Sequence, residues 1–407
     1  MIPFWSVIPF IVLLLIIALL PIIAPHFWES NRHKSILVFI VSLPVLFLFL
    51  QRNPAAILHT LEEYFSFILL LTSLYVISGG ICLTGDLKAT PVVNTTFLAL
   101  GAILANLIGT TGASMILIRP FLKTNSERKN VAHLSVFFIF IVSNCGGLLT
   151  PLGDPPLFLG YLQGVPFFWT FTLFPIWCCM NFALLGIFFF FDTRAYRRES
   201  KKSLQLDATH LQPLRLQGSR NFLFLGGVLC AVFLNTPWRE LIMILMMLLS
   251  FMVGSKKARA RNQFTWGPIV EVAILFAGIF ITMVPALMFL KEHAVAFGIV
   301  KPWQFFWTTG IVSGFLDNAP AYLTFLTLAQ GLGLPPEVAG IPESILKAIS
   351  VGAVFMGANS YIGNGPNFMV RAIAEHAGFK PPSFFHYMLY AALVLFPLYG
   401  MIHLIFF

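Results

Sequence analysis

The stretch Ser143-Asn-Cys-Gly-Gly-Leu-Leu-Thr-Pro-Leu-Gly-Asp-Pro-Pro156 interrupts an apolar run that covers residues 131–162. The run exceeds the roughly 20 residues that one membrane-spanning helix needs, and its Gly and Pro residues break helical hydrogen bonding. Unwound backbone within a bilayer is tolerated only where it lines a cavity or is buried in protein. A carboxylate such as Asp154 at that depth costs about 2.5–3.5 kcal/mol on insertion scales, which makes it a functional candidate.

The composition of the whole chain agrees with a membrane setting. Hydrophobic residues make up 58% of the 407 residues and charged residues only 10%, whereas soluble domains carry about 25% charged residues. The composition therefore predicts a polytopic membrane protein and excludes a disordered chain, a secreted disulfide scaffold and a nucleic-acid-binding domain. The five cysteines lie in apolar stretches without metal-ligand spacing, so we interpret them as small core residues.

Four apolar runs depart from the pattern of a simple spanning helix. Residues 97–118 and 305–328 have polar middles, and residues 131–162 and 346–375 are long runs broken by Gly, Pro and Asn. The two kinds of run occur in the same order in both halves of the chain, which indicates an internal duplication. We interpret the first kind as re-entrant hairpins and the second kind as broken helices.

The number of crossings then sets the orientation of the halves. If each hairpin enters and leaves by one face, a half crosses the membrane five times, so the second half is inverted relative to the first. The predicted fold is all-α, with two inverted repeats of five transmembrane helices and one hairpin each, as in secondary transporters. The first repeat covers 1–191, a polar linker covers 192–220, and the second repeat covers 221–407.

The basic residues favour one orientation in the membrane. On this topology one face receives nineteen Lys and Arg residues and the opposite face receives five. Because cytoplasmic loops carry the excess of Lys and Arg, the first face is predicted to be cytoplasmic. The linker is then cytoplasmic, both termini lie outside, and the expected location is the inner (plasma) membrane. The formal net charge of +9 is explained as an orientation signal rather than as a binding patch.

Oxygen-bearing side chains gather in the interrupted runs. Asp154 and Asp317 are the two acids inside them, and we predict that both carry the transported proton or cation. Freed carbonyls and polar side chains nearby are ready ligands for a hard cation, although a single Asn or Thr in a membrane helix also serves as an interhelical hydrogen bond. The predicted ion- or substrate-binding residues are Asn106, Thr110, Thr111, Ser143, Asn144, Thr150, Asn318, Asn359, Ser360, Asn364 and Asn367.

Two segments carry a resemblance to a known family. Ser143 to Asp154 and Asp317-Asn-Ala-Pro320 resemble the signature segments of NhaD-type sodium/proton antiporters of the ion-transporter superfamily, whose members include arsenite pumps, citrate carriers and dicarboxylate/sodium symporters. The resemblance implies a homodimer in which a mobile transport domain moves against a scaffold as an elevator. It also implies a sodium site at Asn144, Asp154, Asp317 and Asn318.

The chain departs from these relatives at two points. The antiporters have small hydroxyl residues after the Asp that Asp154 matches, whereas Pro155 and Pro156 follow here. The dicarboxylate symporters have Ser-Asn-Thr at both hairpin tips, whereas the first tip here is Gly109-Thr-Thr-Gly112. The first difference affects the coordination of the ion, and the second argues against a di- or tricarboxylate substrate.

The residues support three functional hypotheses. The first is a sodium/proton antiporter that transports Na⁺ and H⁺ without a cofactor, because one carboxylate binds either ion. The alternative is a sodium-coupled transporter of an anion such as citrate, a dicarboxylate or arsenite, with Arg371 near the anion. The remote alternative is an intramembrane aspartyl protease, but the motif order around Asp154 and Asp317 is wrong for one. No phosphate-binding loop that would indicate an ATPase occurs in the sequence.

Overall fold

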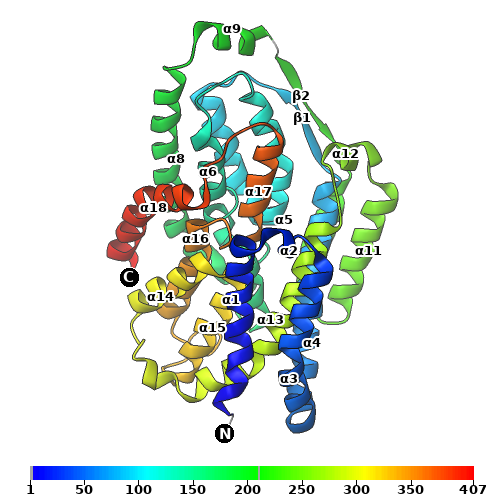
Figure 1. Ribbon diagram of the computed structural model, residues 1–407, viewed down its shortest axis with the longest axis vertical. Coiled ribbons are helices and arrows are strands. Elements are labelled where there is room, and N and C mark those ends of the chain that lie inside the picture. Colours follow the sequence, from blue (N-terminus) through cyan, green and yellow to red (C-terminus); the bar gives the residue numbers. More distant parts are fainter. Residues whose placement is uncertain (1–2, 210) are drawn as a thin grey trace.

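The computed structural model describes residues 3–209 and 211–407, and it is mostly helical (Figure 1). The first half of the chain contains η1 (Phe4–Val7, a 3-10 helix, as are all η elements), α1 (Ile8–Ile23), α2 (Pro25–Trp28), α3 (Asn31–Arg52), α4 (Pro54–Gly79), β1 (Cys82–Asp86), α5 (Pro91–Thr124), α6 (Ala132–Ile141), η2 (Cys145–Leu149), α7 (Pro155–Leu162), η3 (Phe167–Leu173) and α8 (Phe174–Tyr196).

The rest of the chain contains the linker elements and the second half. These are α9 (Lys201–Thr209), β2 (Gln212–Gln217), α10 (Asn221–Val232), α11 (Trp238–Val253), α12 (Lys256–Arg261), α13 (Gly267–Glu292), η4 (Ala294–Phe297), α14 (Pro302–Phe315), α15 (Asn318–Gly331), α16 (Glu343–Met356), η5 (Gly357–Asn359), α17 (Gly365–His376) and α18 (Phe384–Phe406).

The chain is a multi-pass membrane protein. Within residues 3–209 and 211–407, eight helices are long and apolar enough to cross a membrane, whereas the sequence predicts ten crossing helices and two hairpins. The difference arises partly in α10 and α11, which have 12 and 16 residues and at about 1.5 Å per residue are shorter than a 30 Å hydrocarbon core. The N-terminus and the linker helix α9 lie at opposite ends of the molecule (Figure 1).

The prediction of a purely α-helical fold is wrong in one detail. β1 and β2 form a two-stranded antiparallel sheet that pairs Cys82 with Gln217 and Thr84 with Arg215. Gly85 breaks the regular pattern with a positive φ of 139°, at the register shift between Thr84 and Asp86. Part of the predicted polar linker is therefore a strand, β2, which pairs with β1 just beyond the end of α4.

The long helix α5 reverses direction at Gly109. This residue has φ 78° and ψ 154°, a left-handed region that favours glycine. A straight helix of 34 residues would be about 51 Å long, yet Asn94 and Asn125 donate to each other's side-chain oxygens at 2.9 and 2.8 Å. The rings of Phe97 and Phe121 also lie 5.9 Å apart. The two halves of α5 therefore lie side by side, with Gly109 at the tip.

A buried ion-pair network holds the base of α5. Arg128 Nη2 lies 2.6 Å from Asp192 Oδ1, and Asp192 also interacts with Asn94 Nδ2 and His133 Nε2, each at 2.9 Å. The linker attaches to the same base, because the backbone N–H of Ala89 donates to the Asp207 carboxylate at 3.1 and 3.2 Å. These contacts place the base of α5 relative to α6, α8 and α9.

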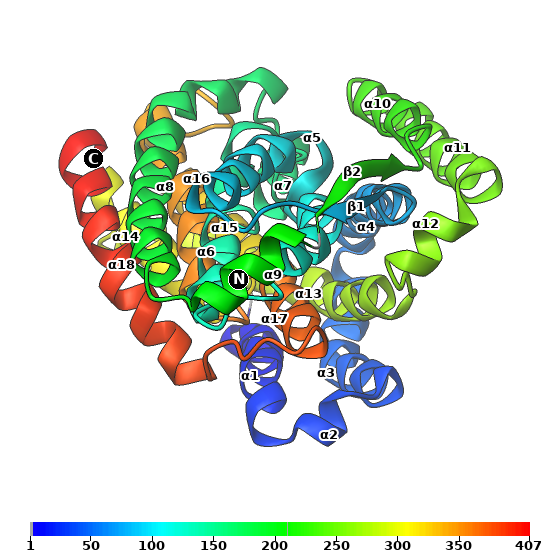
Figure 2. The ribbon, with the colours of Figure 1, turned by 90° about the horizontal axis from the view of Figure 1, so that it is seen from above.

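The other interrupted elements gather near the centre of the molecule. α14 and α15 pack against each other and are separated by the non-helical residues Leu316 and Asp317. Figure 2 shows α6, α7 and α15 near the centre, with α8, α14 and α18 along one side and α4, α10 and α11 along the other.

Each broken helix turns around a pair of glycines six residues apart. A Cβ added at Gly153 would lie 2.2 Å from the carbonyl oxygen of Gly147, and one added at Gly363 would lie 2.5 Å from that of Gly357. Two stretches of backbone therefore touch directly at each break. A side chain at either position would push them apart.

We predict that Gly153→Ala destabilises the protein, because its methyl group must displace the Gly147 backbone and overpacking typically costs about 1–3 kcal/mol. The measurement is the melting temperature of the purified protein in detergent.

The matched control is Gly186→Ala in the middle of α8, where an added Cβ meets nothing within 4 Å. That change should leave stability equal or raise it by up to about 1 kcal/mol. Equal melting temperatures for the two variants would contradict the role of the glycine contact.

Candidate functional site

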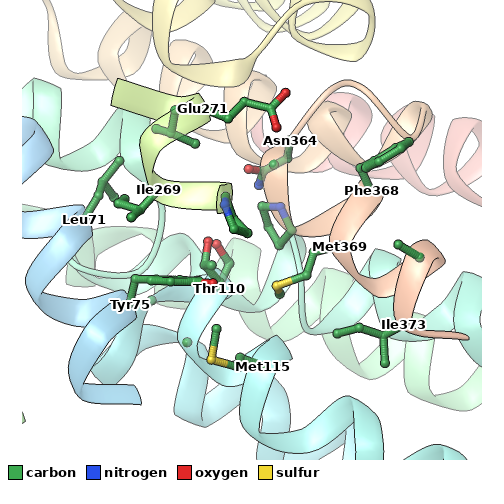
Figure 3. A pocket seen from close by; sticks show the side chains of 18 of the residues that line it. Leu71, Tyr75, Thr110, Met115, Ile269, Glu271, Asn364, Phe368, Met369 and Ile373 are labelled. Carbon is green, nitrogen blue, oxygen red and sulfur yellow. The ribbon is translucent and has the colours of Figure 1, made fainter. Parts of the chain in front are cut away.

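A large cavity lies among the interrupted elements. It has a volume of about 950 Å³ and is lined by the α5 tip, the start of α7, the α14–α15 junction and the start of α17, together with α3, α4 and α13. Figure 3 shows Tyr75, Thr110, Asn364 and Met369 around this space. Cavities of roughly 300–1,000 Å³ are typical of sites for small organic molecules.

The carboxylate of Asp154, in the cavity wall, accepts hydrogen bonds from three side chains. Its Oδ1 accepts hydrogen bonds from Thr110 Oγ1 at 2.9 Å and from Asn364 Nδ2 at 3.0 Å, and its Oδ2 accepts one from Asn318 Nδ2. The three donors come from α5, from the second broken helix and from the α14–α15 junction. All three donors are neutral, so they orient the carboxylate without cancelling its charge.

Asp317 brings a second carboxylate to the same cavity. It begins α15, where its Oδ1 accepts from the backbone N–H of Ala319 at 3.1 Å, and it lines the cavity with Asp154. The next residue, Asn318, is the donor to Asp154, so one short segment joins both acids.

Asn318 also has an amide oxygen that lacks a partner. The residue is fully buried, and among the described residues nothing donates to its Oδ1. An unsatisfied buried acceptor is costly. Carboxylate and amide oxygens are ligands of the kind that suits hard cations.

A second group of predicted residues joins the two broken helices behind the cavity. Asn144 Nδ2 donates to Asn367 Oδ1 at 2.7 Å, and Asn364 Nδ2 lies 3.2 Å from Asn144 Oδ1. Asn367 Nδ2 also donates to the carbonyls of Gly357 and Ser360, each at 2.9 Å. These amides satisfy unwound backbone, which has no water to bind at that depth.

The remaining predicted residues also make protein contacts. Asn106 Oδ1 accepts from the backbone of Leu149 at 2.8 Å, Ser143 and Ser114 share a hydrogen bond of 2.9 Å, and Asn359 accepts from Tyr399 at 3.0 Å. The predicted residues that line the cavity are Thr110, Thr111, Asp154, Asp317 and Asn364.

The two breaks are built alike. The hydroxyls of Thr150 and Ser360 donate to carbonyl oxygens in the preceding interrupted elements, those of Asn106 at 2.5 Å and of Gly314 at 2.6 Å. Four residues later, Asp154 and Asn364 begin the next helices with similar backbone angles, φ −144° and ψ 144° against φ −154° and ψ 139°. Asp154 and Asn364 therefore hold corresponding positions.

Sequence reasoning missed a charged pair in the cavity wall. Lys34 of α3 lies 2.5 Å from Glu271 of α13, and both line the cavity. The two residues are 237 positions apart, so no local pattern links them. Arg371, expected near an anion, is instead paired with Glu375 at 2.9 Å, and its guanidinium lies 4.7 Å from the centre of the Tyr361 ring. It is not among the described residues that line the cavity.

Comparison with known proteins identifies a family over the whole chain. The model of a family described as "Putative citrate transport" matches residues 1–407. No curated protein matches the chain. Among the relatives that the signature segments resemble, the match favours the citrate carriers, and it goes against the expectation drawn from the first hairpin tip that the substrate is not a di- or tricarboxylate. The chain belongs to this citrate-transport family, which is part of the ion-transporter superfamily.

Proposed function

We propose that this protein is a secondary transporter that moves an organic anion of the citrate class together with sodium. The observation that carries the proposal is a cavity of about 950 Å³, far larger than a bare ion needs, with the carboxylates of Asp154 and Asp317 in its wall. Sodium binds at Asp154, Asp317 and Asn318, and the anion occupies the remaining volume.

Electrostatics explains why the two substrates are coupled. Two unit charges 4 Å apart interact by about 4 kcal/mol at an effective dielectric constant of 20, so an anion that enters beside two carboxylates is repelled. A cation held between Asp154 and Asp317 reduces this repulsion. The anion therefore binds well only after the cation, and neither crosses efficiently alone.

The proposed architecture is the inverted repeat expected from the sequence. Its support is the likeness of the two breaks, where Thr150 corresponds to Ser360 and Asp154 to Asn364, and the reversal of α5 at Gly109. On this proposal residues 1–191 and 221–407 form the repeats, the linker is cytoplasmic, and both termini lie outside the inner membrane. The assembly is a homodimer with an elevator motion.

On the same topology the cavity opens to the cytoplasm. Arg119, Lys123, Gln263 and His376 line it, and they belong to segments assigned to the cytoplasmic face. The outer side is held by contacts at the C-terminal end of α7, where Gln163 Nε2 donates to Glu63 at 2.6 Å and Tyr161 donates to the carbonyl of Val232 at 2.7 Å. We name these two contacts the outer latch.

The helix α7 links the latch to the ion site. It has eight residues, about 12 Å, with Asp154 at its first end and Gln163 just beyond its last. Because so short a helix moves as one body, a shift of Asp154 on cation binding reaches the latch. This supports alternating access controlled by the cation.

Sodium/proton antiport remains the second candidate. It is favoured by the charge of the site, because the hydrogen-bond donors to Asp154 are neutral and Lys34 is already paired with Glu271. In that mechanism Na⁺ and H⁺ compete for Asp154, and no anion is carried.

We predict that Asp154→Asn lowers sodium-driven citrate uptake by at least about tenfold, since one lost charge-assisted interaction is worth about 1.5–3 kcal/mol. Asp317→Asn should also lower sodium-driven citrate uptake. The measurement is uptake of labelled citrate into proteoliposomes under an imposed sodium gradient.

The control is Glu292→Gln, an exposed acid at the end of α13, which should transport like the wild type. Sodium-driven movement of protons without citrate, reported by a pH-sensitive dye, would replace the proposed function with antiport. Unchanged uptake by Asp154→Asn would remove this residue from the site.

We predict that Gln163→Ala weakens the outer latch. A net hydrogen bond contributes about 0.5–1.5 kcal/mol, so amide hydrogen exchange over residues 160–166 should become roughly 2- to 12-fold faster. Gln330→Ala removes a comparable bond to the carbonyl of Ala339, 3.0 Å long, and should leave exchange over 160–166 unchanged. Equal exchange in Gln163→Ala and the wild type would contradict the latch.

A further inference from the structure

We propose that Lys34 binds a carboxylate group of the transported anion, and that Glu271 occupies Lys34 when the anion is absent. This inference rests on the proposed function and names the cationic part of the same cavity. The carboxylates Asp154 and Asp317 hold the cation, so the anion needs a positive group elsewhere in the wall. Lys34 meets that need by position, charge and free hydrogen-bonding capacity.

Lys34 is buried to an unusual degree. Only 3% of its surface is exposed, whereas lysine is almost never fully buried unless it is paired. Its Nζ lies 2.5 Å from Glu271 Oε1 and 5.2 Å from the centre of the Trp28 ring. Both Lys34 and Glu271 line the cavity, and Figure 3 shows the Glu271 carboxylate extending from α13 among the lining residues.

The ion pair is not the only contact between these helices. α3 and α13 already pack closely, with Val38 of α3 within contact distance of a Cβ built at Gly278 of α13. Replacing a buried ion pair by apolar side chains is often neutral or stabilising. A charged pair that faces a substrate cavity is therefore better explained by binding than by stability.

The two side chains of the ion pair differ in their exposure. The side chain of Glu271 is 36% exposed, against 3% for that of Lys34, so Glu271 can turn away while the ammonium stays in the wall. Lysine has three N–H donors, and one carboxylate oxygen among the described residues accepts from it. A carboxylate of the anion can replace Glu271 or join it.

Other cations near the cavity fit this role less well. Lys123 is exposed and donates to Gln212 at 3.2 Å, and Arg119 lies one turn earlier, 3.5 Å from Gln263. Both lie on the second half of α5 toward its base, where they suit the capture of an anion at the mouth. Arg371 is paired with Glu375 outside the wall.

The position of Lys34 also gives the anion a part in the transport cycle. Lys34 belongs to α3, which lies with α4 at one side of the molecule, whereas Asp154 begins α7, one of the central broken elements (Figures 1 and 2). An anion held by Lys34 and by the bound cation bridges the two groups of helices. When they move apart, one of the two contacts is lost and the anion is released.

The experiment compares three variants in proteoliposomes: Lys34→Gln, Glu271→Gln and the double variant. Lys34→Gln should raise the KM for citrate about tenfold or more, since a hydrogen bond to a charged group is lost. Glu271→Gln should lower the KM, because the competing carboxylate is gone. The double variant should match Lys34→Gln, and Lys34→Arg should keep most of the affinity. The sodium concentration for half-maximal uptake at saturating citrate should stay within about twofold in all of them.

The outcomes separate this inference from the proposed function. A double variant that regains the wild-type KM would show that Lys34 is needed only to neutralise Glu271, and not to bind the anion. That result would overturn the inference. An unchanged KM in Lys34→Gln would do the same while citrate transport stands. A wild-type protein that carries sodium and protons but no citrate would overturn the proposed function, and the inference with it. Retained melting temperature in the double variant and in Lys34→Arg shows that loss of folding does not produce the result.

Discussion

The hydrogen bonds that cross between the two broken helices are the constraint on which the centre of this protein depends. An interrupted helix inside a membrane exposes backbone groups that neither lipid nor water can satisfy. Here the amides of Asn144, Asn364 and Asn367 bind one another and the carbonyls of Ser143, Gly357 and Ser360. Each broken helix thus supplies hydrogen-bonding partners that the other needs. These bonds hold the first turns of α7 and α17 at the cavity.

The same arrangement accounts for the chemistry. Asp154 starts α7, and its oxygens are held by donors from three separate segments. These bonds orient the carboxylate, and because the donors are neutral they do not cancel its charge, which on the proposed function binds the cation. Asp317 brings a second carboxylate to the same cavity, and the buried amide oxygen of Asn318 has no partner among the described residues. The family match to citrate transport and the size of the cavity favour an organic anion as the second substrate.

Sequence patterns located the elements that contain the site but not all of its members. Gly, Pro and Asn within apolar runs pointed to the breaks, because these residues interrupt helices whatever they pack against. The patterns did not separate residues that face the cavity, such as Thr110 and Asn364, from those that satisfy backbone behind it, such as Asn144 and Asn367. That difference depends on which side of an unwound segment turns inward. The Lys34–Glu271 pair and the pairing of β1 with β2 were also missed, because both join segments far apart in the chain.

The linker is attached to two different helices. Its strand β2 is hydrogen-bonded to β1 just beyond the end of α4, while the Asp207 carboxylate of α9 accepts from the backbone N–H of Ala89 at the base of α5. These two attachments join α4 and α5 outside the cavity that both helices line. On the proposed elevator motion, a displacement of α5 past α4 would strain one of them.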